Sequence, residues 1–435
     1  MKWTLRRRAG LVMALTTFWS CGGDSPLGPE APRTDPNKQA SEKPKPSAKP
    51  AVLVHVGLEQ VDADRGAPLK GKKVGIIVHA ASVTSDGRRT VEVLRAAGVE
   101  VVKIFGPEHG AQGKAAAGEK VADAVDPLAR VPVVSLYGDK TKPSAEDLKG
   151  LDALVFDLQD GGVRFYTYVS TMILALEAAA DADIEFVVLD RPNPLGGERV
   201  EGPESDSRDV VPASLVNTAP GPLVHGLTAG EMAQFVNSAR SKPARLTVVP
   251  MHGWKRSMTW AETGRAWVAP SPNIRSSEAA LVYPGTALLE GTNVSEGRGT
   301  DAPFLMIGAP WLKAEAVIPS LPAKGLTLET AAFTPAVSAA APAPKYVGQP
   351  CAGIRIGIKD TAAVAPYKFG VGLLVALKAQ PGFEWLKDGA AIDRLVGTKK
   401  LRAAIDRGDP FDAIVAADLP AIEAFRKARQ KSLLY

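Results

Sequence analysis

Residues 153–197 read ALVFDLQDGGVRFYTYVSTMILALEAAADADIEFVVLDRPNPLGG, and this stretch decides the fold. Ala153–Leu158 and Glu185–Leu189 are short apolar runs, which predict buried strands. Between them, Thr167–Ala180 is a longer apolar segment that predicts a helix. A strand, a helix and a second strand in this order predict one unit of a parallel sheet covered on both faces.

The same alternation continues on both sides of this stretch. Further strands are predicted at Lys73–His79, Glu100–Phe105, Pro132–Leu136 and Arg245–Pro250, with helices near Arg88–Ala97, Ser144–Lys149 and Thr228–Arg240. We therefore expect residues 52–304 to form a Rossmann-like α/β domain with a parallel sheet.

A smaller α+β domain is expected over residues 305–435. The sequence predicts a strand at Cys351–Lys359, a helix at Val371–Lys378 and a helical segment at Ala390–Arg407 that breaks at Gly397. Residues 336–344 consist mostly of Ala and Pro and predict an extended loop.

The N-terminus has the pattern of a bacterial export signal. Arg6, Arg7 and Arg8 precede a short apolar run, which is too short to span a bilayer, and Cys21 follows directly. Residues 1–21 are therefore expected to be a signal of the lipoprotein type, acylated at Cys21, with plain secretion as the alternative. Residues 22–51 are rich in Pro and Lys and are expected to be a disordered tether. We expect the protein in the cell envelope or outside the cell.

The charge gives no indication of a nucleic-acid partner. The formal net charge is +5, but residues 1–50 contain nine Lys and Arg against four Asp and Glu. The rest of the chain has equal numbers of basic and acidic residues, so a clustered basic face is not indicated. Only two cysteines are present, and no ligand spacing indicates a metal. No cofactor is expected.

Polar segments marked by Gly or Pro follow four of the predicted strands. They begin at Gly106, Tyr137, Gln159 and Asp190. Because ligands bind beyond the carboxyl ends of strands in an open parallel sheet, we expect these segments to line one cleft. A later run, EGTNVSEGRGT at residues 290–300, combines carboxylates, amides and an Arg among glycines. Such side chains suit the hydroxyl groups of a sugar.

Ten strings in this order resemble the exo-β-N-acetylmuramidase family, whose members trim N-acetylmuramic acid from the ends of peptidoglycan glycans. The strings are GPEHG, SLYG, FDLQDGGVRFYTY, VLDRPNPLGG, VEGP, HGLTAGEMA, PSPN, YPGT, EGTNVSEGRGT and GAPW. The resemblance covers about residues 55–435 and implies a Rossmann-like domain, a C-terminal domain and a site between them. The chain departs from the family pattern at His79, in place of a polar turn, and at the pair Gly161-Gly162.

The resemblance makes Glu108 the first candidate for a catalytic carboxyl group. A glycosidase needs an acid that protonates the leaving oxygen, and a semi-buried carboxyl group suits this role. A structural Glu that pairs with an Arg is the alternative. His109 is expected to orient Glu108 or bind substrate, unless its role is structural.

Asp160 and Glu296 are the other catalytic candidates. Either Asp157 or Asp160 is expected to face the cleft, and the other to form a salt bridge with Arg164. For Asp190, an internal pair with Arg191 is the alternative to a role in the site.

Glu296 and Arg298 are expected to clamp the substrate, because an Arg matches the lactyl carboxylate of N-acetylmuramic acid. A salt-bridged brace of the loop is the alternative. The complete set of candidates for substrate binding is Arg164, Tyr166, Asp190, Asn193, His225, Asn273, Asn293 and Arg298.

Two other functions compete with a hydrolase acting on peptidoglycan saccharides. A nucleotide-dependent enzyme is disfavoured, because the first strand leads into His79-Ala80-Ala81-Ser82 and not into a G-x-G-x-x-G motif. A non-catalytic envelope protein that binds glycans fits the signal and the tether equally well.

Overall fold

The larger sheet has seven strands in the spatial order β3-β4-β2-β1-β5-β6-β7. Their bounds are β1 Lys73–Val78, β2 Glu100–Gly106, β3 Ala124–Val125, β4 Pro132–Ser135, β5 Ala153–Asp157, β6 Glu185–Leu189 and β7 Arg245–Val249. The short edge strand β3 pairs antiparallel with β4, and the other pairs are parallel. The six parallel strands have the Rossmann order 3-2-1-4-5-6, which reverses between β1 and β5.

The computed structural model describes residues 53–206, 208 and 210–435. The expected signal at 1–21 with Cys21 and the expected tether at 22–51 lie outside these residues. Within the described part of the chain, no helix combines the length and the apolar character that crossing a membrane requires.

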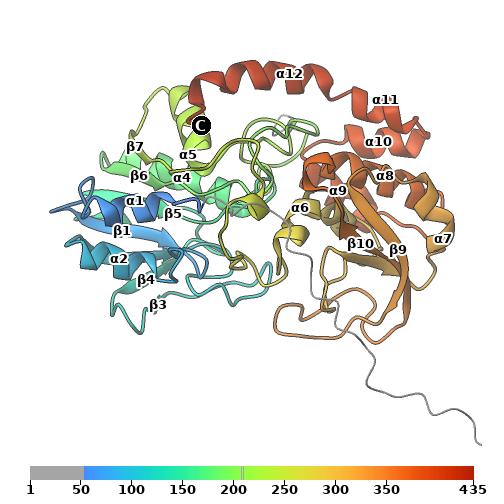
Figure 1. The fold of residues 1–435 in the computed structure, drawn as a ribbon, viewed down its shortest axis with the longest axis horizontal. Helices are drawn as coiled ribbons and strands as arrows, with labels where there is room; N and C mark the ends of the chain where they lie inside the picture. Colours follow the sequence, from blue (N-terminus) through green and yellow to red (C-terminus); the bar gives the residue numbers. More distant parts are fainter. Residues whose placement is uncertain (1–52, 207, 209) are drawn as a thin grey trace, which may run out of the picture. The chain divides into compact units, whose positions relative to one another are not determined.

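Helices cover both faces of this sheet (Figure 1). One apolar cluster joins the sheet to α1 (Gly57–Ala63) and α2 (Thr90–Ala96), and the other joins it to α4 (Thr167–Asp181) and α5 (Ala229–Ser238). Alternate residues of β5 enter the two clusters, which explains why its run ALVFD is apolar at four of five positions and fully buried. The short α3 (Ala145–Leu148) precedes β5.

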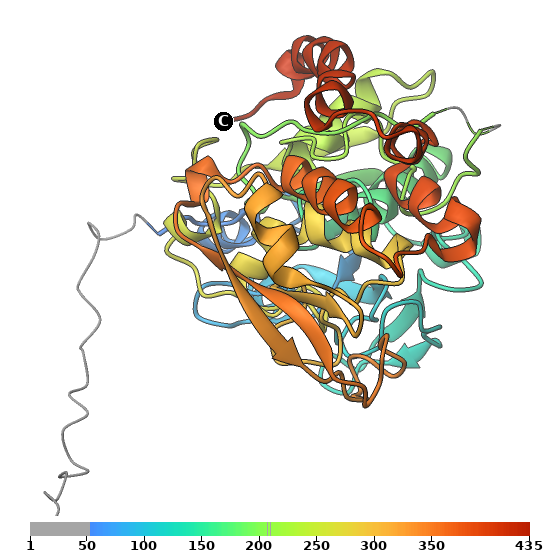
Figure 2. The ribbon, with the colours of Figure 1, turned by 90° about the vertical axis from the view of Figure 1, so that its right-hand side faces the viewer.

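The C-terminal part contains a second sheet of three antiparallel strands in the order β8-β10-β9 (Figure 2). The strands are β8 Met306–Ala309, β9 Leu326–Phe333 and β10 Cys351–Ile358. The helices here are α6 Ser277–Thr286, α7 Ala314–Val317, α8 Pro366–Lys378, α9 Ala390–Val396, α10 Lys400–Arg407, α11 Phe411–Ala416 and α12 Leu419–Ala428. Short 3₁₀ helices lie at Trp260–Glu262, Ala287–Gly291, Ile318–Ser320, Thr361–Ala363, Leu386–Gly389 and Arg429–Ser432.

The predicted fold class is confirmed, including all six predicted strands of the parallel sheet and the helix break at Gly397. Several elements were not predicted. They include the helix α6, which contains the motif YPGT, and the strands β3, β8 and β9. The domain boundary after residue 304 stays a prediction; α6, which precedes it, packs against α8 of the C-terminal part.

Candidate active site

Glu108 lies in the turn directly after β2. His109 and Gly110 both have a positive φ, and a side chain on Gly106 would strike the backbone nitrogen of Ala111, so the chain turns sharply here. The two carboxylate oxygens of Glu108 accept hydrogen bonds from the backbone N–H of Gly118 at 3.0 Å and the Thr167 hydroxyl at 2.7 Å. Glu108 is therefore held between its own loop and the first turn of α4, and it remains partly exposed.

Tyrosine side chains surround Glu108. The Tyr168 hydroxyl donates to the Pro270 carbonyl oxygen at 2.7 Å and lies 3.3 Å from the backbone oxygen of Glu108. Burial, together with the negative charge of Glu108, raises the pKa of Tyr137 to about 12. Tyr283, from α6, is close enough for the charge of Glu108 to contribute to raising its pKa, although burial contributes most.

Tyr166 is the aromatic residue that connects these rings. Its ring centroid lies 4.8 Å from that of Tyr168 and 6.1 Å from that of Tyr283. The Tyr166 hydroxyl is buried and has no hydrogen-bond partner in the described part of the chain. Tyr166 thus belongs to the group of residues around Glu108.

His109 connects Glu108 with the glycine-rich run of residues 290–300. Its Nδ1 lies 2.8 Å from the Ala115 carbonyl oxygen, which fixes Nδ1 as the protonated nitrogen. Burial lowers the pKa of His109, the charge of Glu108 opposes this effect, and the charge of Arg298 adds to it. The charges of Glu108 and Arg298 thus both act on the imidazole.

Glu296 and Arg298 belong to a network of four charged side chains. Glu296 pairs with Lys345 at 2.9 Å and with Arg298 at 3.2 Å, and Arg298 also pairs with Glu290 at 2.8 Å. Burial opposes ionisation of Glu296, but the charges of Lys345 and Arg298 outweigh it and lower its pKa. The side chain of Arg298 keeps 19% of its surface exposed, so the predicted brace is present and a contact with substrate remains open.

Asp160 follows β5 and is buried, with one oxygen accepting the backbone N–H of Gly162 at 2.7 Å. Its other oxygen has no hydrogen-bond partner among the described residues. Burial raises the pKa of Asp160 to about 7. Asp160 lies near Tyr166 and Tyr168, because its charge contributes to raising the pKa of both.

The salt bridge expected between Arg164 and Asp157 or Asp160 is absent. Arg164 is fully buried and donates to the carbonyl oxygens of Pro203, Gly221 and Val396. These contacts correct the expectation that Arg164 binds substrate, because its guanidinium group donates to backbone oxygens inside the protein.

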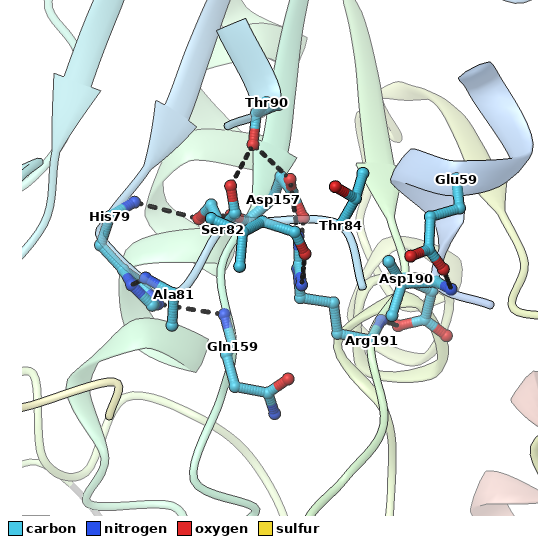
Figure 3. Close-up of polar contacts among 12 residues, drawn as sticks. Glu59, His79, Ala81, Ser82, Thr84, Thr90, Asp157, Gln159, Asp190 and Arg191 are labelled. Atoms are coloured by element: carbon cyan, nitrogen blue, oxygen red, sulfur yellow. Dashed lines mark hydrogen bonds and ion pairs between the residues drawn. The ribbon is translucent and has the colours of Figure 1, made fainter. Parts of the chain in front are cut away.

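Figure 3 shows the actual partner of Asp157, which is Arg191. Two nitrogens of Arg191 lie 2.5 and 3.0 Å from the Asp157 carboxylate, which also accepts the Thr90 hydroxyl at 2.6 Å. The internal pair expected between Asp190 and Arg191 is therefore wrong for their side chains.

Asp190 lies apart from the residues around Glu108. It accepts hydrogen bonds from the Thr228 hydroxyl, the Gly230 backbone N–H and the Tyr435 hydroxyl, at 2.7, 2.8 and 2.8 Å. Burial raises its pKa to about 6. These contacts correct the expected role in substrate binding, because the carboxylate joins α5 to the end of the chain.

The other four predicted residues hold loops through backbone contacts. Asn193 binds the backbone of Leu227 and Leu195, and Asn293 binds that of Gly382 and Glu384. His225 is buried and accepts the backbone N–H of Leu227, and burial lowers its pKa to about 3. For Asn193 and Asn293 the expectation of substrate contact is corrected, whereas Nε2 of His225 is buried without a partner among the described residues, so His225 remains a candidate. Asn273 donates to the Ala340 carbonyl oxygen, but its own side-chain oxygen is buried without a partner and remains a candidate.

Several residues of the site were not predicted. Tyr283 and Glu290 stand in strings that the sequence singles out, so their motifs carried the signal. Lys345 follows an Ala- and Pro-rich stretch without a motif, and nothing in the sequence marks it. In the described residues, no group of three or more His, Cys, Asp or Glu could hold a metal ion.

Comparison with known proteins identifies the family of the chain. Residues 74–278 match the N-terminal family model of the exo-β-N-acetylmuramidase NamZ, and residues 281–435 match the C-terminal one. The chain is 40% identical over 407 residues to the peptidoglycan β-N-acetylmuramidase NamZ of Bacillus subtilis (strain 168), which covers 92% of this chain and 94% of the relative.

Two crystal structures of DUF1343 family proteins from Bacteroides fragilis NCTC 9343 are also similar. One has a TM-score of 0.79 and 32% identity and covers 89% of this chain and 100% of that chain. The other has a TM-score of 0.70 and 30% identity and covers 88% of this chain and 99% of that chain. Both family models and the curated relative show that the chain belongs to the exo-β-N-acetylmuramidase family.

Proposed function

We propose that this protein is an exo-acting glycoside hydrolase that releases N-acetylmuramic acid from the non-reducing ends of peptidoglycan fragments. Membership of the family and the activity after which the Bacillus subtilis relative is named support this proposal over a non-catalytic glycan-binding protein. The observation that carries it is Glu108, a partly exposed carboxyl group at the carboxyl end of β2, set among tyrosine side chains.

Glu108 is the general acid in this proposal. It protonates the glycosidic oxygen as the bond from that oxygen to the anomeric carbon breaks, and water finally supplies the hydroxyl group at the anomeric carbon. Thr167 suits this role because a hydroxyl group can donate to a carboxylate and accept from a carboxylic acid. The Gly118 N–H fixes the other oxygen, so the carboxyl group keeps one orientation.

Arg298 supplies a positive charge beside the acid. N-acetylmuramic acid differs from N-acetylglucosamine by a lactyl ether that carries a carboxylate. The part of Arg298 that remains exposed can bind this carboxylate while Glu290 and Glu296 hold the guanidinium group in place. Glu108 directly precedes His109, and Arg298 is close enough for its charge to lower the pKa of His109, so we place the acid and the cation in one substrate site.

The test is hydrolysis of a chromogenic β-N-acetylmuramide beside the matching glucosaminide. Wild type should prefer the muramide. On a peptidoglycan disaccharide, whose sugar leaving group needs a proton, Glu108→Gln should lower kcat by at least about a hundredfold, because general acid catalysis contributes this much or more. Glu100→Gln, a change at an exposed position at the start of β2, is the control and should leave kcat unchanged. Full activity of Glu108→Gln on the disaccharide would remove Glu108 from the mechanism.

We also propose that the protein is exported and anchored through a lipid on Cys21. The basic start, the short apolar run and the position of Cys21 support this proposal. Cys21→Ala should release the exported protein from the membrane fraction, because acylation supplies the anchor. A wild-type protein that is already soluble after export would contradict it.

A further inference from the structure

Residues 334–350, which connect β9 to β10, form a loop that packs against the glycine-rich run of residues 290–300. The Ala336 N–H donates to the Gly299 carbonyl oxygen at 2.9 Å. A side chain on Gly299, whose φ is +82°, would come within 2.6 Å of the Ala336 carbonyl oxygen, so the loop can pack here only against glycine. The loop therefore fixes the chain directly after Arg298.

Lys345, from the same loop, fixes the chain before Arg298. Its ammonium group donates to the carbonyl oxygens of Leu289 and Val294 at 2.8 and 2.9 Å, and to the Glu296 carboxylate at 2.9 Å. An ammonium group has three N–H donors, so these contacts use all of them. Lys345 therefore has no donor left for a substrate and acts on the site through its partners.

The position of Lys345 is set by the fold around it. Tyr346, the next residue, has a positive φ of 58°, and its hydroxyl accepts the indole N–H of Trp311 at 3.2 Å. Trp311, the last residue of the string GAPW, packs closely on Gly382, where a side chain would come within 2.9 Å of the indole ring. A positive φ outside glycine persists where surrounding contacts hold it. The ammonium group is thus brought to Glu296 by contacts that do not depend on the ion pair.

The charges of this network balance only when Lys345 is counted. The carboxylates of Glu290 and Glu296 both pair with Arg298, at 2.8 and 3.2 Å. These three groups carry a net charge of −1, and Lys345, 2.9 Å from Glu296, brings it to zero. A net negative charge around Arg298 would repel an incoming carboxylate.

We propose that Lys345 is a positioning residue for recognition of the substrate carboxylate, because it neutralises Glu296 and leaves the charge of Arg298 available to the lactyl group. This proposal rests on the proposed function, since it assigns the support of the cation that binds the lactyl carboxylate. Two further titratable groups, Tyr283 of α6 and His109, lie near Arg298. Burial raises the pKa of Tyr283 and lowers that of His109, so both stay neutral near pH 7.

Lys345→Met removes the charge and keeps most of the length of the side chain. At pH 7.5 it should lower kcat/KM on the chromogenic muramide about tenfold, the order expected for loss of one unit charge close to the bound carboxylate. Any activity on the glucosaminide should stay nearly unchanged, because that sugar carries no carboxylate. Lys345→Arg keeps the charge and should retain most of the activity. Lys313→Met, the same change at an exposed position, is the matched control.

A substitution at Glu296 separates the charge of Lys345 from its backbone contacts. Binding of N-acetylmuramic acid and N-acetylglucosamine, titrated into the full-length protein and followed by NMR, is the readout. Lys345→Met should lose affinity only for the acidic sugar, and adding Glu296→Gln should restore most of it, because the network returns to net charge zero. Glu296→Gln alone should bind the acidic sugar at least as tightly as wild type.

The dependence on pH gives an independent readout. In Lys345→Met the pKa of Glu296 should rise, because one of its two cations is lost. Protonation of Glu296 also returns the network to net charge zero, so affinity for N-acetylmuramic acid relative to wild type should recover as pH falls from 7.5 to 5.5.

Three results would overturn the proposal. They are full affinity for N-acetylmuramic acid in Lys345→Met, an equal loss for both sugars that Glu296→Gln does not reverse, and weaker binding of the acidic sugar by Glu296→Gln alone. The equal loss would show that Lys345 supports only the backbone. A wild type that binds both sugars but cleaves neither glycoside would contradict the proposed function instead, and the binding series would still test Lys345.

Discussion

Arg298 is a residue whose two possible roles can be separated by substitution. Removal of a charge-assisted hydrogen bond to a substrate costs about 1.5–3 kcal/mol, or roughly ten- to a hundredfold in kcat/KM. Arg298→Ala should therefore lower kcat/KM on the muramide by this factor and leave any glucosaminide activity nearly unchanged. Steady-state kinetics on both substrates measure the difference.

Glu290→Gln is the matched control for Arg298, because it removes an ion-pair partner and keeps the cation. If Arg298 only braces its loop, Glu290→Gln should reproduce much of the loss, and Arg298→Ala should affect both substrates equally. That outcome would contradict recognition of the lactyl carboxylate by Arg298.

Asp160 should make the stability of the protein depend on pH. Its folded-state pKa is about 7, whereas a carboxyl group in an unfolded chain titrates near 4. Between about pH 4 and pH 7 the folded state therefore binds more protons, and the free energy of unfolding falls as pH rises, by at most about 1.4 kcal/mol per pH unit from this group.

Asp160→Asn removes this dependence, so the stability of the variant relative to wild type should rise across the same window and level off above pH 7. Urea unfolding at pH 4.5, 6 and 7.5 measures the difference. Asp412→Asn, at an exposed position in α11, is the control and should show a smaller trend. A constant difference between Asp160→Asn and wild type would show that Asp160 is ionised throughout.

The sequence predicted where Glu108 and Asp160 stand, because both follow strands whose carboxyl ends share one edge of the sheet. It did not predict which polar residues of these loops face inward. Arg164 and Asn193 satisfy backbone groups, and a side chain that does so has the same composition and spacing as one that binds a sugar. Only the path of the remote segments, such as the one that brings the Val396 oxygen to Arg164, distinguishes the two roles.

At the scale of elements, the helices α6 and α8 pack closely where Gly285 of α6 meets Gly370 of α8. A side chain on Gly285 would come within 2.1 Å of the Pro366 carbonyl oxygen, and one on Gly370 within 2.5 Å of the Cα of Gly285. Gly285→Ala should lower the free energy of unfolding by about 3 kcal/mol or more, because backbone atoms cannot move aside as side chains can. Urea unfolding measures this loss.

Glu278→Ala, at an exposed position of α6, is the control, and it should cost well under 1 kcal/mol. An equally small cost for Gly285→Ala would show that the two helices are free to separate. This contact explains why α6 was not predicted from the sequence: Pro and Gly usually mark a turn, but here Gly285 allows close packing inside a helix. The apolar strands of the parallel sheet were easier to predict, because burial on both faces leaves a continuous apolar run.

At the scale of the whole molecule, Tyr435, the last residue of the chain, connects the C-terminal part to the larger sheet through hydrogen bonds. The Tyr435 hydroxyl donates to Asp190 at 2.8 Å and accepts the backbone N–H of Met251 at 2.9 Å. The Leu434 N–H reaches Glu231 of α5, also at 2.9 Å. The chain end therefore contacts residues that follow β6 and β7, and its removal should weaken the connection between the two parts.

Tyr435→Phe keeps the ring, which packs 5.1 Å from Trp254, and removes only the hydroxyl group. The Met251 N–H then loses its partner and Asp190 loses one donor, so the free energy of unfolding should fall by about 1–3 kcal/mol. Leu434→Ala, at a partly exposed side chain, keeps its backbone hydrogen bond and should cost less.

If the hydroxyl joins both parts into one cooperative unit, urea transitions followed by tryptophan fluorescence and by far-UV circular dichroism should coincide in wild type and shift together in Tyr435→Phe. Separate transitions in wild type would show that the two parts unfold independently and that the chain end supports only its local contacts.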